Sequence, residues 1–359
     1  MEQMSIILAE DSHLGAKGTR VNLELTPSDL HEPTEIPTYL AGYRPWEMRA
    51  DECSPALLVD NDEDKFRSFS ESDAFEPVNV KKATTAAIPE IDPRSSLSSY
   101  KVVDRFVGSF VPWHVENQGG SAYAPRMAAA RRCARAILLD RELDVLGSAG
   151  LLPTSANWDS TVVTTLAAGF EWLKIATGVE GASSHPIKNI QDQIELSHQP
   201  VSKILMNQAV AHAFLRHSKV VTHMRQYLGD ANADAVARSL NASASTTGGS
   251  NTDIVIPGLP PIMVSSAKYK NTSGNLVYVM PNVCVLLTVP PGQPTDGEEI
   301  ATSYTFRRRG PSGTGFDSRE FHVEGRGPHG GTMVVVSMAD KAVMTGNNCG
   351  GLIINCIIA

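Results

Sequence analysis

The sequence has no apolar run long enough to cross a bilayer, which takes about 20 consecutive apolar residues. Its first 15 residues carry acidic side chains where a signal peptide carries basic ones. Charged residues make up only 19% of the chain while 42% of its residues are hydrophobic, so a largely disordered chain is excluded. We therefore expect a folded protein that is made in the cytoplasm and has no membrane partner.

Cysteine is scarce and lacks the spacing of a metal or disulfide site. The chain contains five cysteines, Cys53, Cys133, Cys284, Cys349 and Cys356. Their number is odd and no two form a C-x-x-C pair, so neither a zinc site nor a disulfide framework is indicated. Free cysteine is among the most buried residue types. We expect reduced, buried thiols.

Motifs of catalysis and nucleotide binding are also missing, since the chain has no P-loop and no G-x-S-x-G elbow. Residues 325–330 match G-x-G-x-x-G, but Pro328 interrupts the match and a strand-like segment follows instead of the required helix. We interpret this segment as a glycine turn between two strands. His212, His217 and His223 are five and six residues apart, whereas zinc ligands on a helix lie four apart. We expect no catalytic residue, no cofactor and no metal.

The chain carries too little positive charge for a protein whose main function is binding nucleic acid. The net charge is −8, and affinity for nucleic acid comes from lysines and arginines that neutralise phosphates. The charge is also uneven, because residues 1–100 have a net charge of −10 and the remainder of the chain +2. An acidic front is thus attached to a nearly neutral body.

The front of the chain favours extended structure. Residues 1–55 are punctuated by prolines, which disfavour helix, so we predict an extended arm whose apolar side chains, including Trp46, lie in grooves of a neighbour. A flexible tail is the alternative. Residues 101–115 are rich in Val, Phe and Trp and predict a strand. With residues 78–82 as its partner, the segment 56–118 would form a long two-stranded excursion that rests on another surface, because an isolated pair of strands is marginal in water.

The middle of the chain contains its longest predicted helix, which begins after Pro125 and ends at Gly147. Met127, Ala130, Ala134, Ile137 and Leu138 keep to helical spacing and predict its buried face. The helix also carries four arginines, Arg126, Arg131, Arg132 and Arg135. They could contact a polyanion or an acidic neighbour, or simply form a solvated face.

The rest of the chain predicts an α+β protein. A second helix should begin near Ser184 and Pro186, followed by a buried strand after Pro200 and one or two helices up to residue 228. Short apolar segments separated by Gly-rich and Pro-rich turns then predict strands to the end of the chain. Helices in the middle and a sheet at the end are typical of the α+β class.

Two passages carry a resemblance to a known family. They are SSYKVVDRFVGSFVPWHVENQGGSAYAPRMAAARRCARAILLDRELD (98–144) and HPIKNIQDQIELSHQPVSKILMNQAVAHAFLRH (185–217). Together with the order of the elements, they resemble major capsid proteins of tailed bacteriophages, which share the HK97-type fold. The resemblance covers residues 78–359 and, more loosely, the arm. It is one of order and texture, not of a single sharp motif.

The resemblance implies a division into five parts. Residues 1–55 would be the N-arm, 56–118 the E-loop, 119–185 a peripheral domain with the long spine helix, 186–335 an axial domain, and 336–359 strands that return to the core. Such a chain assembles into hexamers and pentamers that form an icosahedral shell around double-stranded DNA. The implied partners are other copies of itself, a separate scaffolding protein, a portal, a decoration protein and non-specifically contacted DNA, and the implied location is the virion.

Residues expected at subunit interfaces come from the arm, the loop and the long helix. They are Trp46, Phe69, Phe75, Lys81, Lys82, Arg126, Arg131, Arg132 and Arg135. We expect the arm and the loop to be poorly packed on their own subunit, and the acidic front of one subunit to lie against basic residues of the next. An encapsulin-like nanocompartment shell and, in a different class, an oligomeric α+β enzyme or binding protein are the alternatives.

Overall fold

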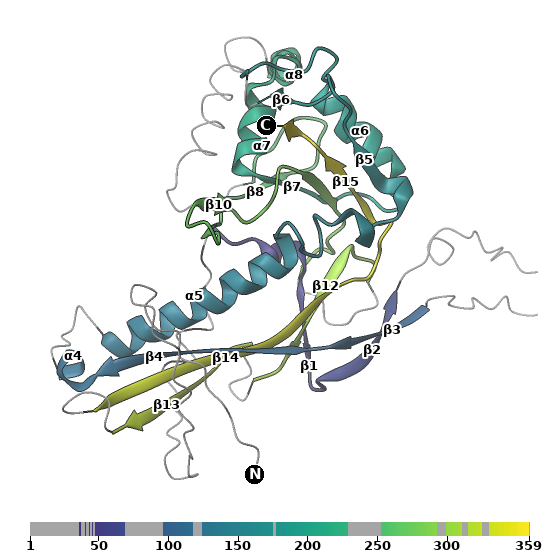
Figure 1. Ribbon diagram of the computed structural model, residues 1–359. Helices are drawn as coiled ribbons and strands as arrows, with labels where there is room; N and C mark the ends of the chain where they lie inside the picture. Colours follow the sequence, from purple (N-terminus) through teal and green to yellow (C-terminus); the bar gives the residue numbers. More distant parts are fainter. Residues whose placement is uncertain are drawn as a thin grey trace, which may run out of the picture.

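The computed structural model describes residues 36, 40, 43, 45, 47–68, 96–117, 124–174, 177–228, 253–292, 299–310, 315–324 and 330–358. They form two lobes (Figure 1). In the elongated lobe, helix α5 (Pro125–Leu146) lies along a long sheet. The second lobe carries three helices around another sheet and holds the C-terminal strands. No helix in the described ranges is long and apolar enough to cross a membrane.

The sheet of the elongated lobe is built around β14 (Gly331–Met344), a Val-rich strand of 14 residues. β14 pairs antiparallel with β4 (Val103–Pro112), β13 (Asp317–Val323) and β12 (Ser303–Arg308). β1 (Ala56–Val59) pairs in parallel with β12. β13 and β14 flank residues 325–330, which confirms that the G-x-G-x-x-G match lies between two antiparallel strands.

Helix α5 begins and ends where the sequence predicts. Pro125 is in its first turn, and the N–H of Gly147 caps the carbonyl of Leu143 at 2.9 Å. Ala130, Ala134 and Ile137 are fully buried, as their spacing predicts. They pack on Val334, Val336 and Met338, which share one face of β14 because side chains alternate along a strand.

The second lobe contains a five-stranded sheet in the order β5 (Val163–Thr165), β15 (Gly350–Ile354), β11 (Cys284–Leu287), β7 (Lys203–Asn207), β8 (Ile262–Ser265). Helices α6 (Pro186–Leu196), α7 (Gln208–Arg216) and α8 (Ser218–Leu228) belong to this lobe. Two small ladders, β6 (Leu173–Lys174) with β16 (Ile357–Ile358) and β9 (Lys268–Lys270) with β10 (Leu276–Tyr278), complete it. All four residues of β11 are buried, as expected of a strand covered on both faces.

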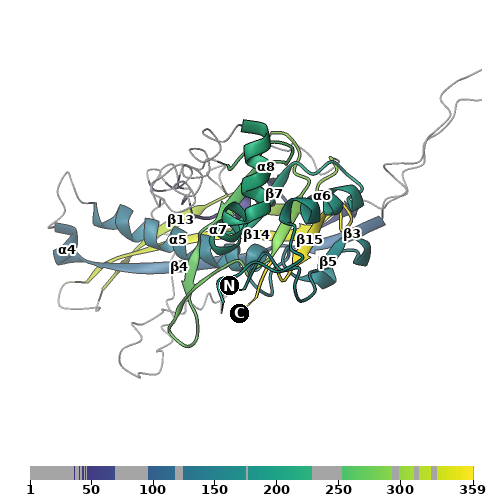
Figure 2. The same ribbon diagram turned by 90° about the horizontal axis from the view of Figure 1, so that it is seen from above.

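A two-stranded hairpin of β2 (Glu63–Ser68) and β3 (Ser96–Lys101) projects from the elongated lobe (Figures 1 and 2). The predicted excursion is therefore present, but its pairing differs from the prediction. The predicted strand 101–115 becomes β4, which pairs with β14 over its whole length. The predicted partner, 78–82, lies outside the described residues. Pairing between strands distant in sequence overrode the local pattern.

Other corrections concern the front of the chain. Helix α2 (Ala50–Cys53) lies inside the predicted extended arm, and Ile36 and Leu40 are buried. Tyr100 in the predicted loop is buried too. The expectation of poor packing on the same subunit is thus wrong for these residues, because they complete the sheet and helix surfaces beside them. Other apolar side chains of the predicted loop are exposed, among them Leu97, Phe106 and Trp113. Trp46, Phe69 and Phe75, which were expected to be exposed, lie outside the described residues.

Two local predictions also differ from the structure. His185, not Ser184, caps α6, accepting a hydrogen bond from the Lys188 N–H at 3.3 Å. β12 and β13 fall in the range 186–335, expected for the axial domain, yet they pair with β14 in the sheet of the elongated lobe. β5 falls in the range 119–185, expected for the peripheral domain, yet it joins the sheet of the second lobe. Short α4 (Trp113–Asn117) follows β4 directly.

Candidate functional site

Five charged side chains meet where the N-terminal segment joins α5 and the long sheet. We call them the junction cluster: Asp51, Arg105, Arg141, Arg307 and Asp340. Asp340 of β14 is 1% exposed and lies at the centre. Its Oδ2 is 2.8 Å from Arg141 Nε and 3.6 Å from Arg307 Nη2, while Oδ1 accepts from Arg105 Nη1. The cluster thus joins α5, β4, β12 and β14.

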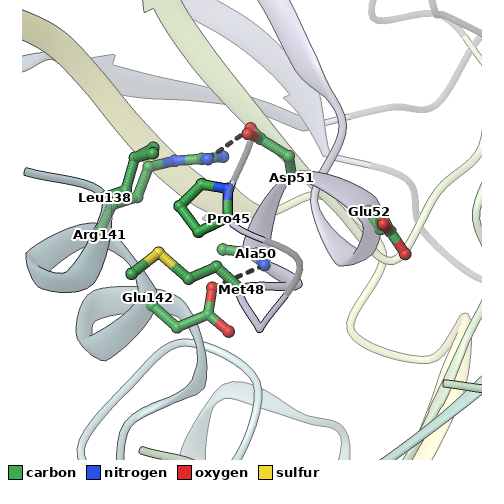
Figure 3. Close-up of a pocket in the computed structure, with 8 residues that line it drawn as sticks. All are labelled: Pro45, Met48, Ala50, Asp51, Glu52, Leu138, Arg141 and Glu142. Atoms are coloured by element: carbon green, nitrogen blue, oxygen red, sulfur yellow. Dashed lines mark hydrogen bonds and ion pairs between the residues drawn. The ribbon is translucent and has the colours of Figure 1, made fainter. Parts of the chain in front are cut away.

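Asp51 connects the N-terminal segment to this cluster. Its Oδ1 lies 2.9 Å from Arg307 Nη2 and also pairs with Arg141 (Figure 3). Burial by itself would raise the pKa of Asp51, but the ion pairs with the two arginines outweigh burial and lower the pKa to about 2. Asp51 is therefore held as a carboxylate wherever the protein is folded near neutral pH.

Glu142 fixes the same segment from the neighbouring position on α5. Its fully buried carboxylate accepts hydrogen bonds from the backbone N–H groups of Arg49, at 2.9 and 3.1 Å, and of Ala50, at 2.8 Å (Figure 3). These N–H groups open helix α2, where a negative charge is favourable. Burial raises the pKa of Glu142 to about 7, and the two backbone N–H groups act against that rise.

A cavity of about 100 Å³ lies beside this attachment. Its lining includes Pro45, Met48 and Leu138 together with Asp51, Arg141 and Glu142 (Figure 3). The arrangement offers fixed charges. Among the described residues that line the cavity, the titratable carboxyl groups include Asp51 and Glu142, and both are engaged, Asp51 by arginines and Glu142 by backbone N–H groups. Removing one partner from such a buried ion pair typically costs about 3 to 5 kcal/mol, because the other charge stays buried without compensation. The cluster can therefore lock the root of the N-terminal segment to the body.

The arginines predicted on the long helix are outside this cluster. Arg126 and Arg135 are exposed and pair within the chain, Arg126 with Glu116 and, at 3.2 Å, with Glu320, and Arg135 with Glu47. Arg131 and Arg132 are exposed on α5. The other predicted interface residues, Trp46, Phe69, Phe75, Lys81 and Lys82, lie outside the described residues.

Acidic residues from the front of the chain form ion pairs with arginines at the end of β12 within one subunit. Arg308 Nη1 is 3.0 Å from Asp62 and its Nη2 is 2.9 Å from Asp104. Arg309 Nε is 3.8 Å from Asp60. These arginines at the end of β12 therefore find acidic partners on their own subunit, because the pairing of β1 with β12 brings Asp60 and Asp62 beside them. The expected contact with the next subunit stays a prediction.

Sequence reasoning missed the whole junction cluster, although α5 carried one signal of it. Arg141 and Glu142 follow Ile137 and Leu138 by four residues, so both continue the buried stripe of the helix. Charged residues on such a stripe indicate buried partners. Nothing in the local pattern of Asp51, Arg105 or Asp340 identifies those partners.

His217 lies beside a serine but is not oriented to act as its base. The Lys219 N–H donates to His217 Nδ1 at 3.2 Å, so Nε2 carries the proton and faces Ser184 Oγ at 3.1 Å. A nitrogen that donates to a serine cannot remove its proton. Burial also lowers the pKa of His217. Across the described ranges, no three His, Cys, Asp or Glu side chains are grouped as metal ligands.

Comparison with known proteins identifies the fold. No family model and no curated protein matches the sequence. Among solved structures, a phage-related protein from Bordetella bronchiseptica RB50 is 16% identical, with a TM-score of 0.62 over 90% of this chain and 97% of that one. The capsid structure of the cyanophage P-SCSP1u is 10% identical, with a TM-score of 0.50 over 96% and 93%.

These likenesses span both lobes, and the α+β architecture that they share is the one expected from the order of the elements. At sequence identities of 10% and 16%, these similarities establish the fold and not the roles of individual residues. The chain therefore has the HK97-type fold of phage capsid proteins.

Proposed function

We propose that this chain is the major capsid protein of a tailed bacteriophage. In this proposal it assembles into hexamers and pentamers that form an icosahedral shell around double-stranded DNA in the virion. The observation that carries the proposal is the likeness of fold over 96% of the chain to the cyanophage capsid structure. The role is structural, and no catalytic residue is assigned.

In the proposed shell, α5 is the spine helix and the elongated lobe is the peripheral domain. The second lobe is the axial domain, and the β2–β3 hairpin is the root of the E-loop. Residues 1–55 are the N-arm, with their last part, from Arg49, attached by Asp51 and Glu142. These assignments replace the continuous ranges 119–185, 186–335 and 336–359, because the strands of each lobe come from separate parts of the chain.

The junction cluster supports this role mechanically. A force on the N-terminal segment passes through Asp51 into α5 and β12, and through Glu142 into α5. An arm that reaches a neighbour is useful only when its root does not move on its own subunit. Shell contacts are individually moderate and numerous, so rigid roots allow their energies to add across the lattice.

The proposed partners are further copies of this chain, a separate scaffolding protein, a portal and a decoration protein. DNA would be packed without sequence-specific contacts, which agrees with a net charge of −8. The direct test is expression of the chain followed by size-exclusion chromatography and negative-stain microscopy. Closed particles of uniform diameter are expected. A dimer or tetramer that binds a small ligand saturably would overturn the proposal.

The content of the particles separates phage head from nanocompartment. Particles produced with the neighbouring portal and packaging genes should protect double-stranded DNA from nuclease. Particles that instead enclose a specific protein cargo, and never DNA, would assign the chain to an encapsulin-like shell.

A further inference from the structure

The β2–β3 hairpin is joined to the body by very short connections. It follows β1 after three residues, 60–62, and precedes β4 after one, Val102. At its base, the backbone N–H of Val102 donates to the carbonyl of Asp62 at 2.9 Å, next to the Glu63–Lys101 pair of the ladder. Two strands alone are marginally stable in water, so contacts with the body have to determine its direction. One of them is weak and lies at the far end of β2, where Ser68 Oγ donates to the Thr345 carbonyl at 3.5 Å.

Phe306 of β12 receives one aromatic ring from each strand of the hairpin. Tyr100 of β3 stacks on it with ring centroids 4.1 Å apart and an interplanar angle of 5°. Phe66 of β2 lies against it at 5.5 Å and 43°. Tyr100 and Phe306 are both nearly buried. Rotation of the hairpin about its base would separate both rings from Phe306, and aromatic pairs are worth about 0.5 to 1.5 kcal/mol beyond the area that they bury.

Arg308, two residues further along β12, links the connection before β2 to strand β4, which follows the hairpin. One nitrogen of its guanidinium lies 3.0 Å from Asp62, before β2, and the other 2.9 Å from Asp104, after β3. A planar guanidinium binds two such carboxylates only in one relative geometry. The group is 41% exposed, so it contributes direction more than stability and is screened by salt.

We propose that Phe306 and Arg308 form a clamp that sets the angle at which the β2–β3 hairpin leaves the subunit, and that this angle positions the hairpin on the next subunit. Both are positioning residues, and this inference rests on the proposed shell function. The clamp belongs to β12, which is held by β14 on one side and β1 on the other. The sheet of the elongated lobe therefore fixes the direction of the hairpin through β12.

The test measures the hairpin angle on the soluble chain. Spin labels are placed on cysteines introduced as Leu97→Cys in β3 and Ala136→Cys in α5, both exposed positions. The five native thiols are buried and should not react. Phe306→Leu and Arg308→Gln are each expected to widen the distribution of label distances about twofold, since a lone hairpin is marginal. Leu58→Ala, on β1 and outside the aromatic cluster, is the matched control and should leave the distribution unchanged.

Salt supplies a second measurement. We expect 1 M NaCl to widen the wild-type distribution, and to widen that of Arg308→Gln less, because the pairs of Arg308 are already lost there while exposed pairs such as Arg309–Asp60 remain. Unchanged distances in both variants would overturn the clamp. Particle diameters of the same variants test the positioning step: a broader range of diameters is expected, and uniform particles of wild-type size would contradict it. Absence of particles from the wild type would count against the proposed function, while the label distances still decide the clamp.

Discussion

Asp340 of β14 and Arg141 of α5 form a buried ion pair, with Oδ2 and Nε 2.8 Å apart. Their side chains are 2% and 3% exposed, respectively, and each also pairs with other charged residues. These are Arg105, Arg307 and Asp51. The pair therefore makes the packing of α5 on the sheet depend on the attachment of the N-terminal segment.

Asp340→Asn should lower the free energy of unfolding by about 3 to 5 kcal/mol, because Arg105, Arg141 and Arg307 lose the buried carboxylate that they share. Urea denaturation followed by circular dichroism measures the change. Asp140→Asn, which removes an exposed partner of Arg105, is the matched control and should cost at most about 1 kcal/mol. Equal effects of the two changes would contradict the assignment of Asp340 as the centre of the cluster.

Stability should fall as pH rises from about 4.5 to about 7, through Glu142. The folded-state pKa of Glu142, about 7, lies above its ordinary value of 4.5, so the folded protein binds a proton more tightly than the unfolded chain. That stabilisation is complete below pH 4.5 and lost by about pH 7, and it amounts to roughly 3 kcal/mol at 1.36 kcal/mol per pH unit. Urea midpoints across this range measure it. Glu142→Gln cannot titrate, and the same slope in that variant would refute the assignment.

Arg132→Glu should impair assembly more than folding. Arg132 is exposed on the spine helix, so its reversal costs the subunit little, whereas a repeated contact in a shell is lost many times over. Circular dichroism should match the wild type while the particle count by microscopy falls. Assembly of the wild type should also weaken with salt once the screening length drops below about 10 Å. Normal empty particles with failed packaging would instead place this arginine toward DNA.

The five thiols should be inert in the native protein. All are buried, and burial raises the pKa of Cys133 and Cys349 to about 11 each. It raises those of Cys53, Cys284 and Cys356 as well. A chromogenic disulfide reagent at pH 8 should titrate no thiol in the native protein and five in denaturant. Rapid reaction of any native thiol would reveal local opening around it.

No covalent bond between subunits is expected. An isopeptide bond between a lysine and an asparagine needs a nearby carboxylate that accepts and returns a proton. The only acidic residue beyond Glu324 is Asp340, which is paired with arginines. Asn348 is buried and bonded to His198 at 3.1 Å, although Asn347 is exposed. Boiled and reduced particles should therefore run as one band of 38.6 kDa on a gel. A ladder of multimers would contradict this, with Lys81 and Lys82 as the first residues to replace.

The local sequence pattern was enough to predict those helices and strands whose signals lie within their own span. Helix α5 was recognised because Pro125, Gly147 and an apolar repeat of helical period all lie within its own span. The strands β7, β11 and β14 were visible for the same reason, as short apolar segments between turns. The cap of α6 was assigned one residue too early because Ser184 is the commoner capping residue, and in the fold its hydroxyl faces His217 instead.

Composition and periodicity were enough to predict the class of the fold, the long helix, the strands β7, β11 and β14 and the burial of the thiols, since they encode which residues avoid water. Tertiary structure alone decided which charges meet. Asp51, Arg105, Arg141, Arg307 and Asp340 come from five separate elements. The pairing of β1 with β12, of β12 with β14 and of β4 with β14, together with the packing of α5 on this sheet, brings them together. Ion pairs leave no period in a sequence, because each partner is chosen by position in space and not by distance along the chain.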